Sequence, residues 1–146
     1  MAERQARRRD DVAAFLDGVT PAKRQRDART MLDVMARVTG QPAHLWGTIV
    51  GFGTYHYRYA SGREGDAPAA AFAPRKAALV VYLSDGVGAH ADLLARLGPH
   101  TMGVSCVYLK DLAQNDLPIL EQIVARSYAT LTAGTYGSRA RDSGRP

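Results

Sequence analysis

Apolar side chains recur every three to four residues from Val12 to Val38, which is the spacing of α-helices that pack by one face. The pattern predicts a first helix from residue 10 to about Gly18. It predicts a second helix that Thr20 caps, with Pro21 in its first turn and Gly40 after its end. The apolar stripe of this second helix is Met31, Val34, Met35 and Val38. Its other face is expected to be solvated and consists of Lys23, Arg24, Arg26, Asp27, Arg29, Asp33 and Arg37.

From residue 45 the pattern changes to short apolar runs separated by glycine, proline and charged residues, which is typical of β-strands. Four runs are expected to be strands: LWGTIVGFG (45–53), TYHYRYA (54–60), APAAAFA (67–73) and AALVVYL (77–83). A parallel crossover needs a dozen or more residues, and these linkers have only a few. The four strands are therefore predicted to form an antiparallel meander.

The last third of the chain returns to helix, strand and helix. GVGAHADLLARLG predicts a helix that ends at Gly98, and GVSCVYL predicts a fifth strand. Residues 116–133 predict a last helix, capped by Asp116 with Pro118 in its first turn. The order ααββββαβα defines an α+β domain over 10–133, with about five antiparallel strands and helices on one face. Segments 1–9 and 134–146 are expected to be disordered tails, because they lack apolar periodicity.

Composition and charge exclude several classes. The 146 residues fit one domain, and no apolar run is long enough to span a membrane. Cys106 is the only cysteine, which rules out an internal disulfide and a thiolate-cage zinc site and suits a reducing cytoplasm. Of the net charge of +5, the two tails carry +3 and +2, so the body is neutral. A nucleic-acid-binding domain needs a basic face on its folded part, so nucleic acid is not expected as a partner.

The segment from Gly51 to Lys76 is the most informative about function. Strand alternation places Tyr55 and Tyr57 on one side and His56 and Arg58 on the other. The tyrosines are expected to face the helices, and the basic side is expected near the charged turns. Guanidinium and imidazole groups suit a small anion, whereas pairing of Arg58 with neighbouring carboxylates explains the same residues structurally. The candidate ligand-binding residues are Tyr55, His56, Tyr57, Arg58, Arg63, Glu64, Arg75, Lys76 and His100.

Four further signals have simpler interpretations. Gly86, Gly88 and Ala91 match a dinucleotide fingerprint, but the expected antiparallel meander favours a plain glycine turn. The four histidines show no metal-ligand spacing, so no metal site is predicted. Cys106 is expected to be buried and inert, and Trp46 is expected to fill the core.

Several motifs occur in order along the chain: WGTIVGFGTYHYRYASGREGD, FAPRK, LARLG-x-H and SCVYLKDL. With them, residues 10–131 resemble the YdhG-like domain family of unknown function. The resemblance implies a small bacterial cytoplasmic α+β domain with helices on one face of an antiparallel sheet. One branch of that family is described as a frataxin-like iron chaperone. The chain departs from the family pattern at Pro99, Thr101 and Val104, where lysines are usual around this turn.

The residues and the resemblance together predict a noncatalytic module that binds a small anionic ligand without a resident cofactor. Two alternatives stay open. One is a frataxin-like chaperone that binds iron weakly through carboxylates. The other is an enzyme with Cys106 as nucleophile and His100 as base. A sheet with helices on one side also leaves a face that must be polar, liganded or paired, so a homodimer is expected.

Overall fold

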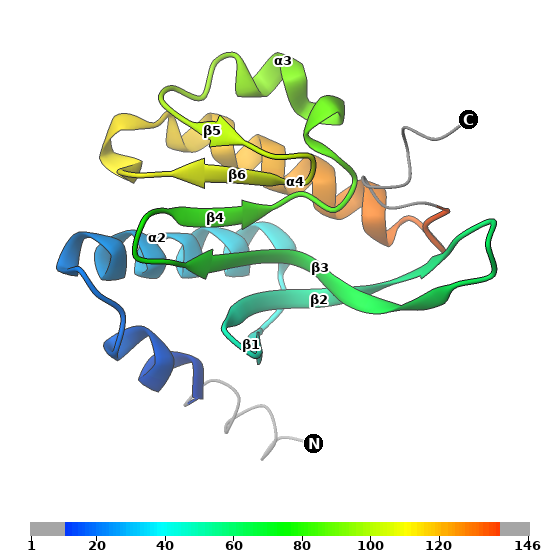
Figure 1. Cartoon of the computed structure of the whole chain (residues 1–146), viewed down its shortest axis with the longest axis horizontal. Helices are drawn as coiled ribbons and strands as arrows, with labels where there is room; N and C mark the ends of the chain where they lie inside the picture. Colours follow the sequence, from blue (N-terminus) through cyan, green and yellow to red (C-terminus); the bar gives the residue numbers. More distant parts are fainter. Residues whose placement is uncertain (1–10, 138–146) are drawn as a thin grey trace.

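The computed structural model describes residues 11–137, which form helices packed against one antiparallel sheet (Figure 1). The expected tail 1–9 and most of the tail 134–146 lie outside the described residues. The sheet has the order β1-β2-β3-β4-β6-β5, and each neighbouring pair is antiparallel. Its strands are β1 (Ala43–Trp46), β2 (Ile49–Arg58), β3 (Glu64–Pro74), β4 (Leu79–Tyr82), β5 (Thr101–Met102) and β6 (Cys106–Leu109).

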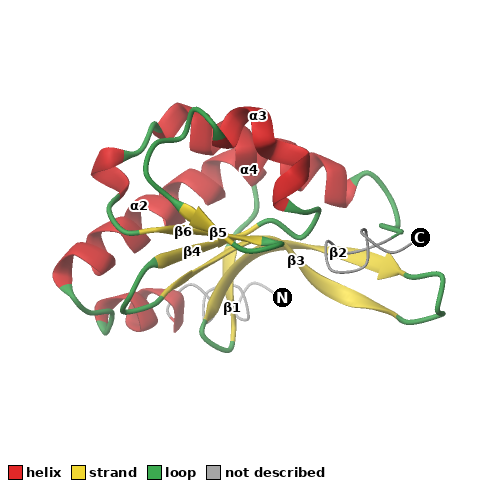
Figure 2. Cartoon of the chain, turned by 45° about the horizontal axis from the view of Figure 1, so that its top comes forward, coloured by secondary structure: helices red, strands yellow, loops and turns green. Residues whose placement is uncertain are grey.

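Three helices cover one face of this sheet (Figure 2). They are α2 (Ala22–Thr39), the short α3 (Ala91–Leu94) and α4 (Leu117–Thr132), and residues 11–17 are helical as well. A row of paired apolar residues crosses four strands of the sheet, from β2 through β3 and β4 to β6: Val50, Phe72, Val81 and Val107. Met31 and Met35 of α2 and Ile123 of α4 are fully buried in the same core. The predicted α+β class with a one-sided helical layer is confirmed.

The helix boundaries confirm one predicted cap and correct another. The Asp116 carboxylate accepts a hydrogen bond from the Ile119 amide at 3.2 Å, so it caps α4 as expected. Thr20 does not cap α2, because the N-cap residue is Pro21 and no side chain caps this end. The helix predicted to end at Gly98 is instead a 3₁₀ turn, η1 (Val87–His90), followed by the single turn of α3.

The strands differ from the prediction at two glycines. The run 45–53 divides at Gly47 and Thr48 into a hairpin, in which Trp46 pairs with Ile49. The rest of this first run joins the second predicted run (54–60) in one strand, because β2 continues through Gly53 to Arg58. Gly53 has φ +67°, and a Cβ there would lie 3.3 Å from the Tyr128 ring, so the close approach of α4 favours glycine. Trp46 is 38% exposed on the sheet and does not fill the core.

The C-terminal end of the described chain adds one bridge to β2. The Tyr136 amide donates to the His56 carbonyl at 2.8 Å, and the Arg58 amide donates to the Tyr136 carbonyl at 2.9 Å. The Tyr136 ring meets Tyr55 edge-on, at 6.1 Å between ring centres. Ordered contacts therefore extend past residue 133, the expected end of the domain. No helix within residues 11–137 has the length and apolar character needed to cross a bilayer.

Candidate functional site

The nine predicted site residues fall in three separate places. β2 and β3 form a long hairpin, and the 11 residues of β3 span about 33 Å between its two ends. Glu64 begins β3 and Pro74 ends it, so the charged turns at the two ends do not meet. The single aromatic and basic recess expected from the sequence is therefore not formed. Tyr55 and Tyr57 lie under α4. His56, Arg58, Arg63 and Glu64 lie on the hairpin. Arg75, Lys76 and His100 lie at the other end of the sheet.

The tyrosines lie on the helical side, as predicted. Tyr55 is 3% exposed and packs with Leu131 of α4 in a small cluster apart from the main core. Tyr57 is half-buried and stacks on Tyr59, with 4.9 Å between ring centres. Because the sheet separates them from His56 and Arg58, the phenols and the basic groups do not share a binding surface.

The outward face of the hairpin carries a small charged network. His56 contacts Asp66 through Nδ1 at 2.9 Å and Glu64 through Nε2 at 3.4 Å, and Arg58 Nε donates to Glu64 at 2.9 Å. The hydrogen bond to Asp66, and then the one to Glu64, raises the pKa of His56 above 6.5. The hydrogen bond from Arg58 lowers the pKa of Glu64. Because these charges already pair within the protein, this end fits the structural interpretation better than a ligand site.

The opposite end of the sheet is built on a buried arginine. Arg24 of α2 is 3% exposed, and its Nε donates to the Arg75 carbonyl at 2.8 Å, while Nη1 donates to the Lys110 carbonyl at 3.0 Å. Asp27, 1% exposed, lies 4.0 Å from Arg24 and accepts the Leu112 amide at 3.0 Å. The prediction that Arg24 and Asp27 are solvated is wrong. They join the turn between β3 and β4 to the end of β6.

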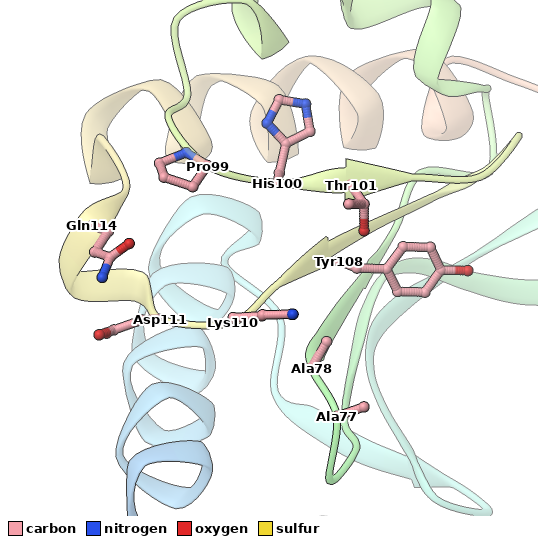
Figure 3. Close-up of a pocket in the computed structure, with 9 residues that line it drawn as sticks. All are labelled: Ala77, Ala78, Pro99, His100, Thr101, Tyr108, Lys110, Asp111 and Gln114. Atoms are coloured by element: carbon pink, nitrogen blue, oxygen red, sulfur yellow. The ribbon is translucent and has the colours of Figure 1, made fainter.

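A pocket of about 570 Å³ opens beside this joined region (Figure 3). Its lining comes from the β3–β4 turn, the residues before β5, and the end of β6 with the segment after it. The lining residues are Ala77, Ala78, Pro99, His100, Thr101, Tyr108, Lys110, Asp111 and Gln114. We call it the Lys110 pocket. Of the nine residues predicted from the sequence, His100 alone lines it.

The charges in the Lys110 pocket are distributed unequally. Asp111 is occupied, because its carboxylate accepts from Arg26 at 2.9 Å and lies 3.8 Å from the Lys23 ammonium. His100 Nδ1 lies 2.7 Å from the Gly98 carbonyl, which leaves Nε2 as the other polar atom of its ring. Across residues 11–137, the Lys110 ammonium has neither an ion pair nor a hydrogen bond. The pocket therefore presents one unneutralised positive charge.

Arg75 and Lys76 lie on the other side of the β3–β4 turn. They line a shallower hollow of about 370 Å³ together with Phe15, Val19 and Thr48. Arg75 Nη1 donates to the Thr48 hydroxyl at 2.7 Å, so its guanidinium is partly engaged. These two predicted residues are thus close to the Lys110 pocket but outside it.

Sequence reasoning missed Tyr108 and Lys110, although both lie in the SCVYLKDL motif. Strand alternation puts them on the same face, two residues apart, where β6 ends. An aromatic residue followed by a lysine two positions later was the sequence signal that could have indicated a binding surface here. The motif drew attention to Cys106 instead, which is half-buried.

The glycine motif before α3 leads to a structural network rather than a nucleotide site. Every pair of neighbouring strands in the sheet formed by β1 to β6 is antiparallel, whereas a dinucleotide fold needs neighbouring parallel strands, so the expected glycine turn is the interpretation that fits. His90 is fully buried and contacts Asp85 through Nε2 at 2.8 Å, and Ser127 Oγ donates to Asp85 at 2.6 Å. Burial raises the pKa of Asp85, but these hydrogen bonds outweigh it and the net shift is downward. Both His90 and Ser127 bind the Asp85 carboxylate, so the three side chains form one buried network.

For the two alternative functions, iron carriage and cysteine-dependent catalysis, the described part of the chain contains no assembled site. Residues 11–137 contain no group of three His, Cys, Asp or Glu side chains placed to hold a metal ion. Among the acidic residues near the start of the chain, Asp17 pairs with Arg29 at 2.6 Å, and Asp10 lies outside the described residues. Cys106 lies against the Tyr108 phenol, and electrostatic repulsion from Cys106 raises the pKa of that phenol. Iron carriage and cysteine chemistry stay predictions without a site.

Comparisons with models of protein families, with curated proteins and with solved structures find no match to this chain.

Proposed function

We propose that this protein is a noncatalytic binding module for a small anionic ligand and that the ligand occupies the Lys110 pocket. One observation carries the proposal: the Lys110 ammonium, which has no partner among residues 11–137, lies at a pocket large enough for a small organic molecule. An ammonium left without a partner in a partly apolar recess favours an anion, because the ligand supplies the missing charge.

The walls of the Lys110 pocket are held in place by a buried side chain. Two parts of its wall, the β3–β4 turn and the end of β6, are joined by the buried guanidinium of Arg24. Preformed walls lower the ordering cost of binding, which is why ligand pockets are commonly built this way. The resemblance to the YdhG-like family, whose function is unknown, agrees with a small α+β domain and stays a prediction.

A thermal-shift screen of small organic acids, phosphates and metal ions tests the proposal. At least one anion is expected to raise the melting temperature of the wild-type protein, because a ligand that binds only the folded state stabilises it. The shift is expected to disappear in Lys110→Gln and to persist in Lys76→Gln, a matched exposed lysine on the other side of the turn. If no anion shifts the wild type, or if Lys76→Gln is the variant that loses the shift, the proposal is wrong.

A further inference from the structure

The walls of the Lys110 pocket are mostly carbon. Ala77 and Ala78 of the β3–β4 turn, Pro99 and the ring of Tyr108 supply apolar surface. Figure 3 shows the Tyr108 ring and the Lys110 side chain on the same side of β6, near Ala78. Tyr108 is 36% exposed, so its ring offers a flat surface on which a second ring can stack. This part of the pocket favours the body of a ligand that is flat and apolar.

The polar groups of the pocket select the charge of the ligand. Lys110 offers one positive charge, whereas Asp111, the only carboxylate among the described lining residues, is already paired with Arg26 at 2.9 Å and with Lys23 at 3.8 Å. A second negative charge on the ligand therefore finds no second lysine or arginine among the described lining residues. Sites for phosphate groups usually combine arginine forks or several backbone amides, which this lining does not offer from its described side chains. One negative charge matches the pocket better than two or more.

Resting on the proposed function above, we propose that the ligand class is an amphipathic monoanion. Its flat aromatic or short aliphatic body lies on Tyr108 and the alanines, and its single carboxylate meets the Lys110 ammonium. The volume of about 570 Å³ fits a body of one or two rings. The pocket therefore discriminates against nucleotides and inorganic polyphosphates, although both are anions.

Amide NMR titrations of the full-length protein with four probes test this assignment. The probes are 1-naphthoate, its neutral analogue 1-naphthamide, pyrophosphate and adenosine monophosphate. We expect 1-naphthoate to shift the amides of Thr101, Tyr108 and Lys110, and to bind about tenfold more tightly than the other three, since a charge-assisted contact is lost in the amide. In Lys110→Gln the affinity for 1-naphthoate is expected to fall to that of 1-naphthamide, whereas in Lys76→Gln it stays unchanged.

Three other outcomes of these titrations would contradict either the ligand class or the binding function itself. If pyrophosphate or adenosine monophosphate binds more tightly than 1-naphthoate and still depends on Lys110, the binding function holds and the ligand class is wrong. If 1-naphthoate and 1-naphthamide bind with equal affinity, the pocket does not discriminate between a charged and a neutral ligand, and the ligand class is wrong. If none of the anions shows a Lys110-dependent affinity, the proposed function fails and this inference fails with it.

Discussion

Replacing Arg24 with methionine removes the guanidinium that joins the β3–β4 turn to β6 and keeps a side chain of similar length. The carbonyls of Arg75 and Lys110 lose donors at 2.8 and 3.0 Å, whereas Asp27 keeps the guanidinium of Arg26 at 3.2 Å. Leaving a buried polar group without a partner costs about 1–3 kcal/mol, and here two carbonyls lose their donor. We expect Arg24→Met to lower the free energy of unfolding by about 2 kcal/mol or more.

Urea unfolding followed by circular dichroism measures this difference, with Arg29→Met as the control. Arg29 lies on the same helix and pairs with Asp17, but both side chains are at least half exposed. An exposed pair contributes about 0–1 kcal/mol, so the control is expected to change stability by no more than that. If Arg24→Met destabilises the protein no more than Arg29→Met does, the claim that Arg24 holds this end of the sheet is refuted.

Two further predictions concern the hairpin and the turn before the pocket. Protonated His56 is stabilised by its carboxylate neighbours, so its NMR titration midpoint is expected above 6.5 and is expected to fall in Asp66→Asn. The contribution of His56 to folding stability is complete below its unfolded pKa near 6.5 and is lost as the pH rises through its higher folded pKa. An unchanged titration midpoint in Asp66→Asn would contradict the assignment of the raised pKa to Asp66. Gly98→Ala is expected to cost about 1–3 kcal/mol, because φ is +103° and a Cβ would lie 2.9 Å from the Gln114 carbonyl. Gly88→Ala, with open space around it, is the control, and equal stability of the two variants in urea would show that Gly98 is not required.

Local patterns predicted the fold well because they act within a few residues. The apolar stripe of α2 and the Asp116 cap of α4 depend only on helix geometry, and both are present. The short linkers also predicted the antiparallel sheet. The hairpin at Gly47 was missed although a local signal was available, because Gly47 is the first residue of a two-residue loop and has a positive φ of 65°, a position where hairpin turns favour glycine.

The candidate site was harder to predict because it depends on contacts distant in sequence. Arg24 looks like an ordinary solvated residue in its helix, and its burial comes from carbonyls 51 and 86 residues away. The basic residues of the β2–β3 segment are close in sequence to Arg75, but the length of the hairpin separates them in space. The importance of Lys110 follows from the side chains around it, because none in the described part of the chain pairs with its charge.

The most direct test of the central claim is a crystal structure of the protein grown with 1-naphthoate. The account predicts density for the naphthyl ring over Tyr108, with the carboxylate within hydrogen-bond distance of Lys110 Nζ. Density for the carboxylate at Arg75 and Lys76, or at the His56 network, with the Lys110 pocket unfilled, would contradict it.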